Sequence, residues 1–156
     1  MIDKAVKLCR KALEHDKKLL FIGNGGSCSQ AEHLACEFGA SGFMAFALTN
    51  SSTLTAIAND YEFKEVFSAQ VDAVAREGDI LFALSTSGMS ENINNAVLAA
   101  HDKNCKVIAL TGRHTPLAKI ADISIEFDGN TQTIQEETLK AGHDIWCKVI
   151  DAGMVG

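Results

Sequence analysis

Long hydrophobic runs, proline and basic residues are all scarce in this sequence. Its 156 residues include one proline, 14 lysine or arginine residues and 20 aspartate or glutamate residues, which give a formal net charge of −6. No apolar run approaches the roughly 18 residues of a membrane span, and the N-terminus lacks the layout of a signal peptide. Clustered lysine and arginine, which a nucleic-acid surface requires, are also missing. We therefore expect a cytoplasmic protein with no membrane or nucleic-acid partner.

Cysteine is too irregularly placed for a disulfide framework. The five cysteines stand at positions 9, 28, 36, 105 and 147, an odd number without a C-x-x-C spacing. Hydrophobic residues make up 47% of the chain, and a chain of this length buries roughly two thirds of its unfolded surface. Because no linker, repeat or low-complexity tract interrupts it, we expect one domain spanning residues 1–156.

Short apolar runs alternate with longer segments of helical periodicity. The apolar runs, read as β-strands, are residues 18–23, 44–48, 79–84, 106–111 and 123–127. The helical segments are residues 3–15, 27–38, 62–76, 91–104 and 131–151. Nearly unbroken apolar strands suit a sheet that is covered on both faces. The alternation predicts parallel strands with right-handed crossovers, hence an α/β fold built as a three-layer sandwich.

Glycine and hydroxyl side chains follow three of the predicted strands. The stretches are GNGGS at 23–27, STSGMS at 85–90 and TGR at 111–113. Ligands of open parallel sheets bind beyond the carboxyl ends of the strands, where loops of this composition can cradle a phosphate. Neither of the first two stretches is a dinucleotide fingerprint or a P-loop, and a plain turn with a serine N-cap is the alternative for each alone. Two such loops in one sheet favour a phosphate site.

His33 and Glu37 stand four residues apart just beyond the first glycine turn. On a helix that begins near Ser27, both side chains point the same way, about one turn past the predicted phosphate site. The reacting end of a short sugar phosphate would lie at that distance. A histidine and a glutamate at this spacing more often form a surface or core hydrogen bond, so a functional role needs support from a second segment.

The last predicted helix supplies that support through Gln135 and His143. The two residues are eight positions apart and lie within about 80° of each other around the helix. With His33 and Glu37 they make two imidazoles, a carboxylate and an amide oxygen, a donor set acceptable to zinc or another divalent metal. Glutamine is an uncommon metal ligand, and a capped or solvated helix histidine is the alternative for His143.

Several blocks of the sequence occur together in one order. They are GNGGS, SQAEHLACE, NDYEF, STSGMSENI, VIALTGR and TIQEETLKAGH, which lie between residues 23 and 143. This set resembles the sugar isomerase (SIS) domain family, and within it the phosphoheptose isomerases, and the resemblance runs from about residue 3 to residue 151. The resemblance implies a five-stranded flavodoxin-like sheet and an aldose–ketose isomerase that converts sedoheptulose 7-phosphate to D-glycero-D-manno-heptose 7-phosphate through an enediol. It also implies one zinc ion per subunit and a homotetramer. A dimer is the alternative, because one helix precedes the first strand in this chain where the family has two.

The resemblance assigns roles at the matching positions. Glu37 corresponds to the catalytic base, and His143 to the partner acid/base. The implied metal ligands are His33, Glu37, Gln135 and His143. The implied substrate and phosphate contacts are Asn24, Gly25, Gly26, Ser27, Asn59, Asp60, Ser85, Thr86, Ser87, Ser90 and Gln135. Asp60 falls on a substrate-contacting position at the subunit interface of the family.

Two departures from the family leave the substrate open. The family has an arginine shortly after the catalytic glutamate, where this chain has Gly39, Ala40 and Ser41. Gln132 replaces an aspartate three residues before the glutamine of the site. Both family positions serve the substrate. The alternatives are an isomerase of another sugar phosphate, a non-catalytic sugar-phosphate sensor, and a protein-binding SIS module of the replication-initiator-associating type.

Overall fold

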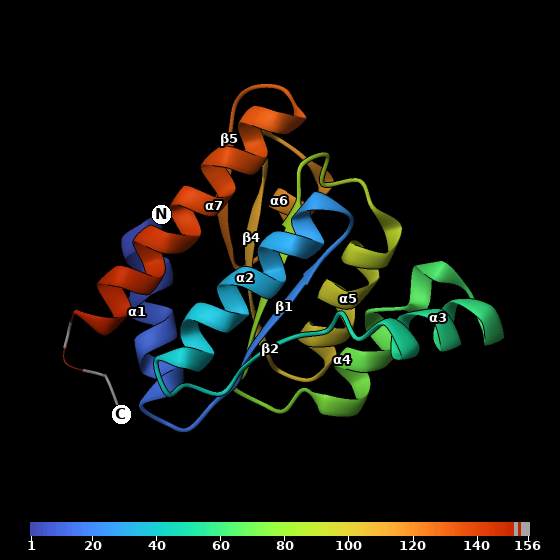
Figure 1. Ribbon diagram of the computed structural model, residues 1–156, viewed down its shortest axis with the longest axis horizontal. Helices are drawn as coiled ribbons and strands as arrows, with labels where there is room; N and C mark the ends of the chain where they lie inside the picture. The colour runs from blue at the N-terminus through green and yellow to red at the C-terminus, as the bar shows by residue number, and fades with distance from the viewer. Residues whose placement is uncertain (152, 154–156) are drawn as a thin grey trace.

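The computed structural model describes residues 1–151 and residue 153. They form a sheet of five parallel strands in the order β2-β1-β3-β4-β5, with helices on both faces (Figure 1). The predicted three-layer α/β sandwich with a flavodoxin-like sheet is confirmed. The predicted domain 1–156 also includes residues 152 and 154–156, which lie outside the described residues. Within the described part of the chain, no helix is long and apolar enough to cross a membrane.

Strands and helices alternate along the chain. The strands are β1 (Leu19–Gly23), β2 (Ala45–Ala47), β3 (Ile80–Ser85), β4 (Lys106–Gly112) and β5 (Ile123–Phe127). The helices are α1 (Ile2–Leu13), α2 (Gly26–Ala40), α3 (Ser51–Asp60), α4 (Ser68–Val74), α5 (Glu91–Asp102), α6 (Pro116–Ile120) and α7 (Thr131–Ile150), with a short 3-10 helix, η1 (Phe63–Glu65), between α3 and α4. Every predicted strand is confirmed to within one residue at each end.

Two hydrophobic cores lie on the two faces of the sheet. The helices α1, α2 and α7 cover one face, and α4, α5 and α6 cover the other (Figure 1). Successive side chains of a strand point to opposite faces, so Phe21 of β1 enters the first core while Ile22 enters the second. Phe21 stacks on Phe82 of β3, with ring centroids 4.6 Å apart. Burial on both faces explains the nearly continuous apolar character of the central strands.

The sequence prediction misses α3 and α6. The Asn50 side chain caps α3 by accepting a hydrogen bond from Thr53 N at 3.1 Å, and Thr115 caps α6 by accepting one from Ala118 N at 3.2 Å. Both are ordinary N-caps. None of the residues of α3 is buried, and α6 has only five residues. Hydrophobic periodicity could therefore not reveal either helix.

The prediction of one helix over residues 62–76 is wrong, because the segment is divided into η1 and α4. At the junction the Ser68 hydroxyl donates to a Glu65 carboxylate oxygen at 2.7 Å. Such local bonds compete with the continuation of a helix. After Val74 the chain leaves the helix, and Arg76 N donates to an Asp79 carboxylate oxygen at 2.8 Å.

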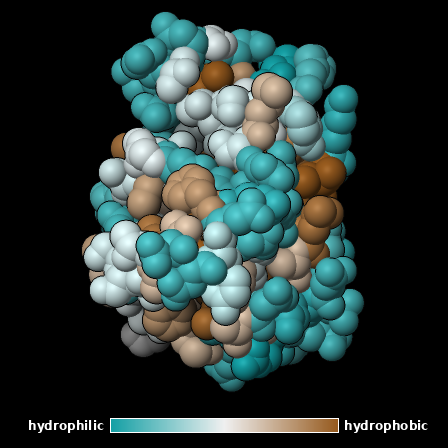
Figure 2. All heavy atoms as spheres, turned by 90° about the vertical axis from the view of Figure 1, so that its right-hand side faces the viewer, coloured by the Kyte–Doolittle hydropathy of each residue, from teal (hydrophilic) through white to brown (hydrophobic). Residues whose placement is uncertain are grey.

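The side of the molecule that carries α3 exposes isolated apolar groups. Figure 2 shows hydrophobic groups scattered among hydrophilic ones on this face. Tyr61 and Phe63, which follow α3, are 74% and 62% exposed. Scattered exposed apolar residues are normal on a protein surface and do not by themselves mark an interface.

The sheet has a topological switch point between β1 and β3. The chain leaves β1 toward β2 on one side and later adds β3 on the other, so the connections diverge there. Ligands of open parallel sheets bind beyond the carboxyl ends of the strands at such a point. Gly23, which ends β1, pairs with Leu84 near the end of β3. The stretches at 23–27 and 85–90 therefore begin side by side.

Asp79 is a buried carboxylate that supports the opposite end of the sheet. It is 1% exposed, accepts hydrogen bonds from Lys18 N and Arg76 N at 2.8 Å each, and lies 2.7 Å from Lys18 Nζ. Replacing Asp79 by alanine leaves these donors without their partner. We expect the free energy of unfolding, measured by urea denaturation, to fall by about 3 kcal/mol.

Asp72→Ala is the matched control for this prediction. Asp72 is 60% exposed and lies 4.0 Å from Lys103. Its removal should change the free energy of unfolding by no more than about 0.5 kcal/mol. Equal stability of the two variants would show that the bonds to Asp79 are not what holds the start of β3.

Candidate active site

A pocket of about 220 Å³ opens beyond the carboxyl ends of β1 and β3. The described residues that line it are uncharged: Asn24, Ser27, Leu84, Ser85, Thr86, Ser87, Ser90, Thr131 and Gln135. Three of them belong to helix N-termini, since Ser27 lies in the first turn of α2, Ser90 is the N-cap of α5 and Thr131 begins α7. A helix N-terminus carries unpaired N–H groups and a positive partial charge. The N-termini of α2, α5 and α7 meet at this pocket, and together they favour the binding of an anion such as phosphate.

A wider hollow of about 770 Å³ lies between α1 and α7. It is lined by side chains of both charges, including the pair formed by Asp3 and Lys148 at 2.7 Å. The hydrogen bond from Lys148 lowers the pKa of the Asp3 carboxyl below its ordinary value. The hollow is far from the strand ends that bind ligands in this kind of sheet. The smaller pocket is therefore the better candidate site.

The hydroxyl groups of the loop after β3 shape the loop itself. Ser85 Oγ accepts a hydrogen bond from Gly88 N at 3.1 Å, and Ser87 Oγ accepts one from Met89 N at 3.2 Å. Gly88 has a φ of +60°, and a Cβ atom added there would lie 2.3 Å from Thr115. Both facts require glycine. The serine and glycine residues that the sequence assigns to a phosphate loop therefore also stabilise the turn of that loop.

The stretch at 111–113 is hydrogen-bonded to the loop after β3. Gly112 N donates to Thr86 O at 3.1 Å, and Leu117 N of α6 donates to Gly88 O at 3.2 Å. None of residues 111–113 is among the described residues that line the pocket. The third glycine-containing stretch therefore supports the site from outside.

Asn24 and Asn92 tie the first loop to α5. Their side-chain amides form two reciprocal Nδ2–H···Oδ1 hydrogen bonds of 2.9 Å each, and Asn92 is 3% exposed. Asn24 lines the pocket with its side chain oriented by this pair, while Gly25 and Gly26 turn the chain into α2. The sequence prediction misses Asn92, because nothing local signals a partner 68 positions away. The one available signal was an amide two residues after Ser90, the end of the serine-rich stretch.

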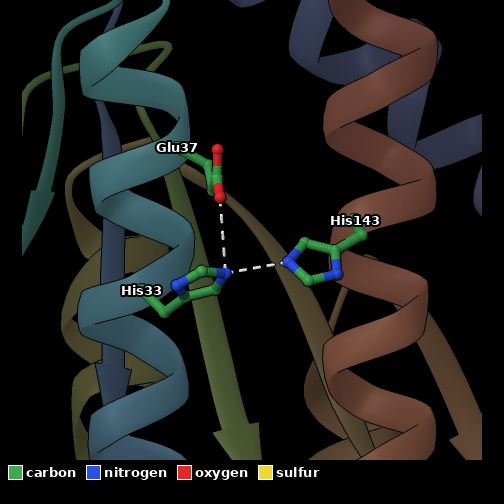
Figure 3. A group of neighbouring side chains, drawn as sticks. All are labelled: His33, Glu37 and His143. Atoms are coloured by element: carbon green, nitrogen blue, oxygen red, sulfur yellow. Dashed lines mark hydrogen bonds and ion pairs between the residues drawn. The ribbon is translucent and has the colours of Figure 1, made fainter.

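His33, Glu37 and His143 point toward one another between α2 and α7 (Figure 3). His33 Nε2 lies 2.8 Å from His143 Nε2 and 3.5 Å from a Glu37 carboxylate oxygen. In a hydrogen bond of this length, one of the two Nε2 atoms donates its N–H group and the other accepts the bond through its lone pair. The side chains of His33 and Glu37 are 45% and 30% exposed, which leaves them accessible to a ligand. Imidazole and carboxylate side chains are the usual general acids and bases of enzymes.

The helices α2 and α7 run parallel, which brings the cluster together. Gln30 Nε2 of α2 donates to Gln135 O of α7 at 2.6 Å, and further along both helices Leu34 packs against Gly142. A Cβ atom added to Gly142 would lie 2.5 Å from Leu34 Cδ2. Glycine at this position lets the helices approach closely beside His143.

The cluster offers a donor set for a divalent metal. One nitrogen from each histidine and one Glu37 oxygen lie within 4.8 Å of one another. Two imidazoles and a carboxylate suit zinc, whose tetrahedral bonds of about 2.0–2.1 Å would separate two nitrogens by about 3.3 Å. His33 and His143 would have to move apart by about half an ångström to reach that separation. The residues present therefore fit a zinc ion after a small adjustment.

Gln135 lies at the pocket and not at the cluster. It is two turns of α7 before His143, a rise of about 12 Å along the helix axis. Its side chain lies against Gly26, where an added Cβ atom would be 2.5 Å from Gln135 Nε2. It lines the pocket, and its predicted contact with phosphate stays a prediction. The predicted metal bond from Gln135 has no geometric support within one chain.

Asn59 and Asp60 lie away from the pocket. They are exposed at the end of α3, and Asn59 Nδ2 donates to Asp60 Oδ1 at 2.9 Å. Neither is among the described residues that line the pocket. The structure of one chain therefore does not bring these two predicted substrate contacts to the site.

The two positions that depart from the family pattern are also resolved. Ser41 Oγ donates to Glu37 O at 2.8 Å and accepts a hydrogen bond from Trp146 Nε1 at 3.0 Å. Gln132 is exposed in the first turn of α7. Ser41 is thus engaged in internal bonds, while Gln132 is open to solvent.

Cys28 lies close to the pocket but is a poor nucleophile. Partial burial, and then the nearby Glu32 carboxylate, raise the pKa of the Cys28 thiol. A thiol with a raised pKa stays protonated near neutral pH, and the thiolate is the reactive form. The chemistry of the site therefore rests on its imidazole and carboxylate groups.

Comparison with known proteins relates this geometry to a family. A family model described as the SIS domain matches residues 1–112. The phosphoheptose isomerase of Aliarcobacter butzleri is 41% identical over 159 aligned residues, which cover 96% of this chain and 84% of that protein. The solved phosphoheptose isomerase of Neisseria gonorrhoeae has a TM-score of 0.94 at 40% identity and covers 96% of this chain and 85% of its own. That of Francisella tularensis has a TM-score of 0.87 at 35% identity, with 95% and 85% covered.

The family model ends before α7, but the matches to whole proteins extend further. A match over 96% of the chain includes most of α7 and so reaches the helix that carries His143. The likeness therefore spans the pocket and both helices of the cluster. This chain belongs to the SIS domain family and is similar, over nearly its whole length, to the phosphoheptose isomerases within it.

Proposed function

We propose that this chain is an aldose–ketose isomerase that converts sedoheptulose 7-phosphate to D-glycero-D-manno-heptose 7-phosphate. One observation carries the proposal: the anion pocket and the imidazole–carboxylate cluster share the helices α2 and α7. A sensor of sugar phosphates would need the pocket and not the cluster. The proteins with about 40% identity that bear the name phosphoheptose isomerase support the same reading.

The separation of pocket and cluster suits a seven-carbon sugar. The rise along α2 from Ser27 to His33 is about 9 Å, and the rise along α7 from Gln135 to His143 is about 12 Å. Carbon–carbon bonds of about 1.5 Å advance an extended chain by about 1.3 Å each, which places C1 of a heptose 7-phosphate about 10 Å from the phosphorus. A pentose 5-phosphate would be shorter by about 2.5 Å on the same estimate. With phosphate in the pocket, the heptose brings C1 and C2 to the cluster.

The proposed reaction moves the carbonyl from C2 to C1 by proton transfer. Glu37 removes a proton from C1 of the open-chain ketose, and His143 protonates the oxygen on C2, which gives the enediol. The oxygen on C1 then loses its proton to His143, and Glu37 returns its proton to C2. The 2.8 Å contact between His33 and His143 supports this role, because it orients the imidazole that handles both oxygens. Phosphate binding at a distance holds the open chain in line.

We further propose that His33, Glu37 and His143 hold a zinc ion. The ion would supply electrophilic polarisation of the sugar carbonyl. Glu37 cannot be a tight ligand and a free base at once, so the proposal places the ion loosely in the cluster or in a structural role. The proton transfers above use the side chains of the chain itself.

The oligomeric state and the cellular location of the chain are also part of the proposal. A single domain over residues 1–156, located in the cytoplasm, would form a homo-oligomer, as a tetramer or a dimer. The predicted substrate contact of Asp60 supports this, since Asp60 lies away from the pocket of its own chain and a second copy would bring it to one. No membrane or nucleic-acid partner is proposed.

The test is turnover of ketose phosphates with five, six and seven carbons, followed by NMR in deuterated water. We expect sedoheptulose 7-phosphate to be converted with a kcat/KM at least about tenfold above that of the shorter sugars. Deuterium should enter C2 of the aldose to the extent that the proton held by Glu37 exchanges with the solvent before it is returned. Loss of turnover with a chelator and recovery with zinc would assign the ion to catalysis. Binding of all three sugars without turnover of any would refute the isomerase and favour a sensor.

A further inference from the structure

Trp146 connects α7 to the last turn of α2. Its Nε1–H group is shared between Glu37 O and Ser41 Oγ, at 3.0 Å each, and Ser41 Oγ donates to Glu37 O at 2.8 Å. Glu37 O otherwise shares the Ser41 N–H group with Phe38 O, both at 3.2 Å. The final carbonyls of a helix lack full intrahelical partners. The indole and the hydroxyl therefore complete the bonding of the backbone of the glutamate in the cluster.

A second bond of the same kind joins the two helices at their other end. There Gln30 of α2 donates to the backbone oxygen of Gln135 of α7 at 2.6 Å. The contact between His33 and His143 lies between this bond and the Trp146 bond along both helices. Parallel helices packed through apolar side chains can shift along each other. Two side-chain-to-backbone bonds, one on each side of the cluster, oppose that shift.

The cluster has little tolerance for such a shift. The 2.8 Å hydrogen bond between the imidazoles weakens steeply as its length and angle change. A displacement of about 1 Å between a catalytic group and its partner can reduce a rate by about 10²-fold. Trp146 lies three residues after His143, one turn along α7, so its bond acts close to the group that must be aligned.

We propose that Trp146 is a positioning residue, which acts through Glu37 O and Ser41 to keep Glu37 and His33 in register with His143. Its indole is partly buried against the first core, but packing alone needs no N–H donor. The kinetic consequence rests on the proposed isomerase activity. The geometric consequence does not, because it concerns the side chains of the free protein.

Trp146→Phe tests the proposal by removing the N–H group while keeping an aromatic ring. We expect kcat for sedoheptulose 7-phosphate to fall by about 10- to 100-fold. KM should stay within about twofold, because the phosphate pocket lies at the other end of the helices. In histidine-labelled NMR spectra without added metal, the ring signals of His33 and His143 should change. Those of His101, which bonds to Asp122 on the far side of the sheet, should not.

Ile145→Val is the matched control, because Ile145 is fully buried on the same helix and has no hydrogen bond to α2. This control variant should lose stability without losing kcat. Unchanged kcat and unchanged signals of His33 and His143 in Trp146→Phe would overturn the proposal. An equal loss of kcat in the control, at equal loss of stability, would reduce Trp146 to a packing role. If the wild-type protein turns over none of the sugars, the NMR comparison decides alone.

Discussion

Replacing Glu37 by glutamine is expected to lower kcat by about 10²- to 10⁴-fold, the usual contribution of a general base. Glutamine has nearly the same shape, but it cannot accept the proton from C1 of the sugar. The change leaves the phosphate pocket intact, since Glu37 is not among the described residues that line it. The dissociation constant for sedoheptulose 7-phosphate, measured by calorimetry, should therefore change by less than about threefold.

Glu32→Gln is the control for the same helix and the same chemical change. Glu32 is exposed on α2, outside the cluster. Its kcat and dissociation constant should match those of the wild-type protein. Full turnover in Glu37→Gln would exclude Glu37 as the base, and loss of binding together with turnover would place it in substrate binding instead.

Gly23→Ala is expected to impair both folding and phosphate binding. A Cβ atom on Gly23 would lie 2.5 Å from the backbone carbonyl carbon and oxygen of Ser27, and 2.9 Å from Cys28 N. Backbone atoms cannot swing aside as a side-chain end can, so the first turn of α2 must move. We expect the free energy of unfolding to fall by about 1–3 kcal/mol, as for other overpacked sites. Because Ser27 lines the pocket, KM should also rise, by about tenfold or more.

Gly39→Ala makes the same change at the other end of α2. The nearest atom to a Cβ there is Ala45 O at 3.9 Å, an ordinary contact. Alanine favours a helix over glycine by up to about 1 kcal/mol, so this variant should be as stable as the wild-type protein or more so. Urea denaturation and the KM for the heptose phosphate measure both variants. A Gly23 variant that behaves like Gly39→Ala would show that the first loop tolerates displacement.

The strands of the sheet could be predicted because each one is a short apolar run that is visible in the sequence itself. The strands that contain Phe21 and Phe82 are buried at every position and almost entirely apolar, as strands covered on both faces are. The α3 helix gave no comparable signal, because none of its residues is buried. The division of the segment 62–76 depends on the bond between Ser68 and Glu65, which hydrophobic periodicity does not register.

The candidate site was predicted where its parts are local. His33 and Glu37 share one helical face, and the loop from Ser85 to Ser90 shows its chemistry in its composition. The bond from Trp146 to Glu37 O spans 109 positions and uses a backbone acceptor, which leaves no trace in the pattern of side chains. Gln135 shows the opposite limit: a helical wheel records the direction of its side chain and omits the rise of about 12 Å that separates it from His143.

The pocket at the three helix N-termini would capture an anion without a formal positive charge in its described lining. A chain with a net charge of −6 repels a phosphate dianion at long range. Added salt screens that repulsion beyond about 10 Å, while hydrogen bonds inside the pocket are short and little affected. Capture by such a pocket would then become faster as ionic strength rises, the reverse of what a lysine- or arginine-lined entrance produces. The arrival of the sugar phosphate would depend on diffusion and fit rather than on electrostatic attraction.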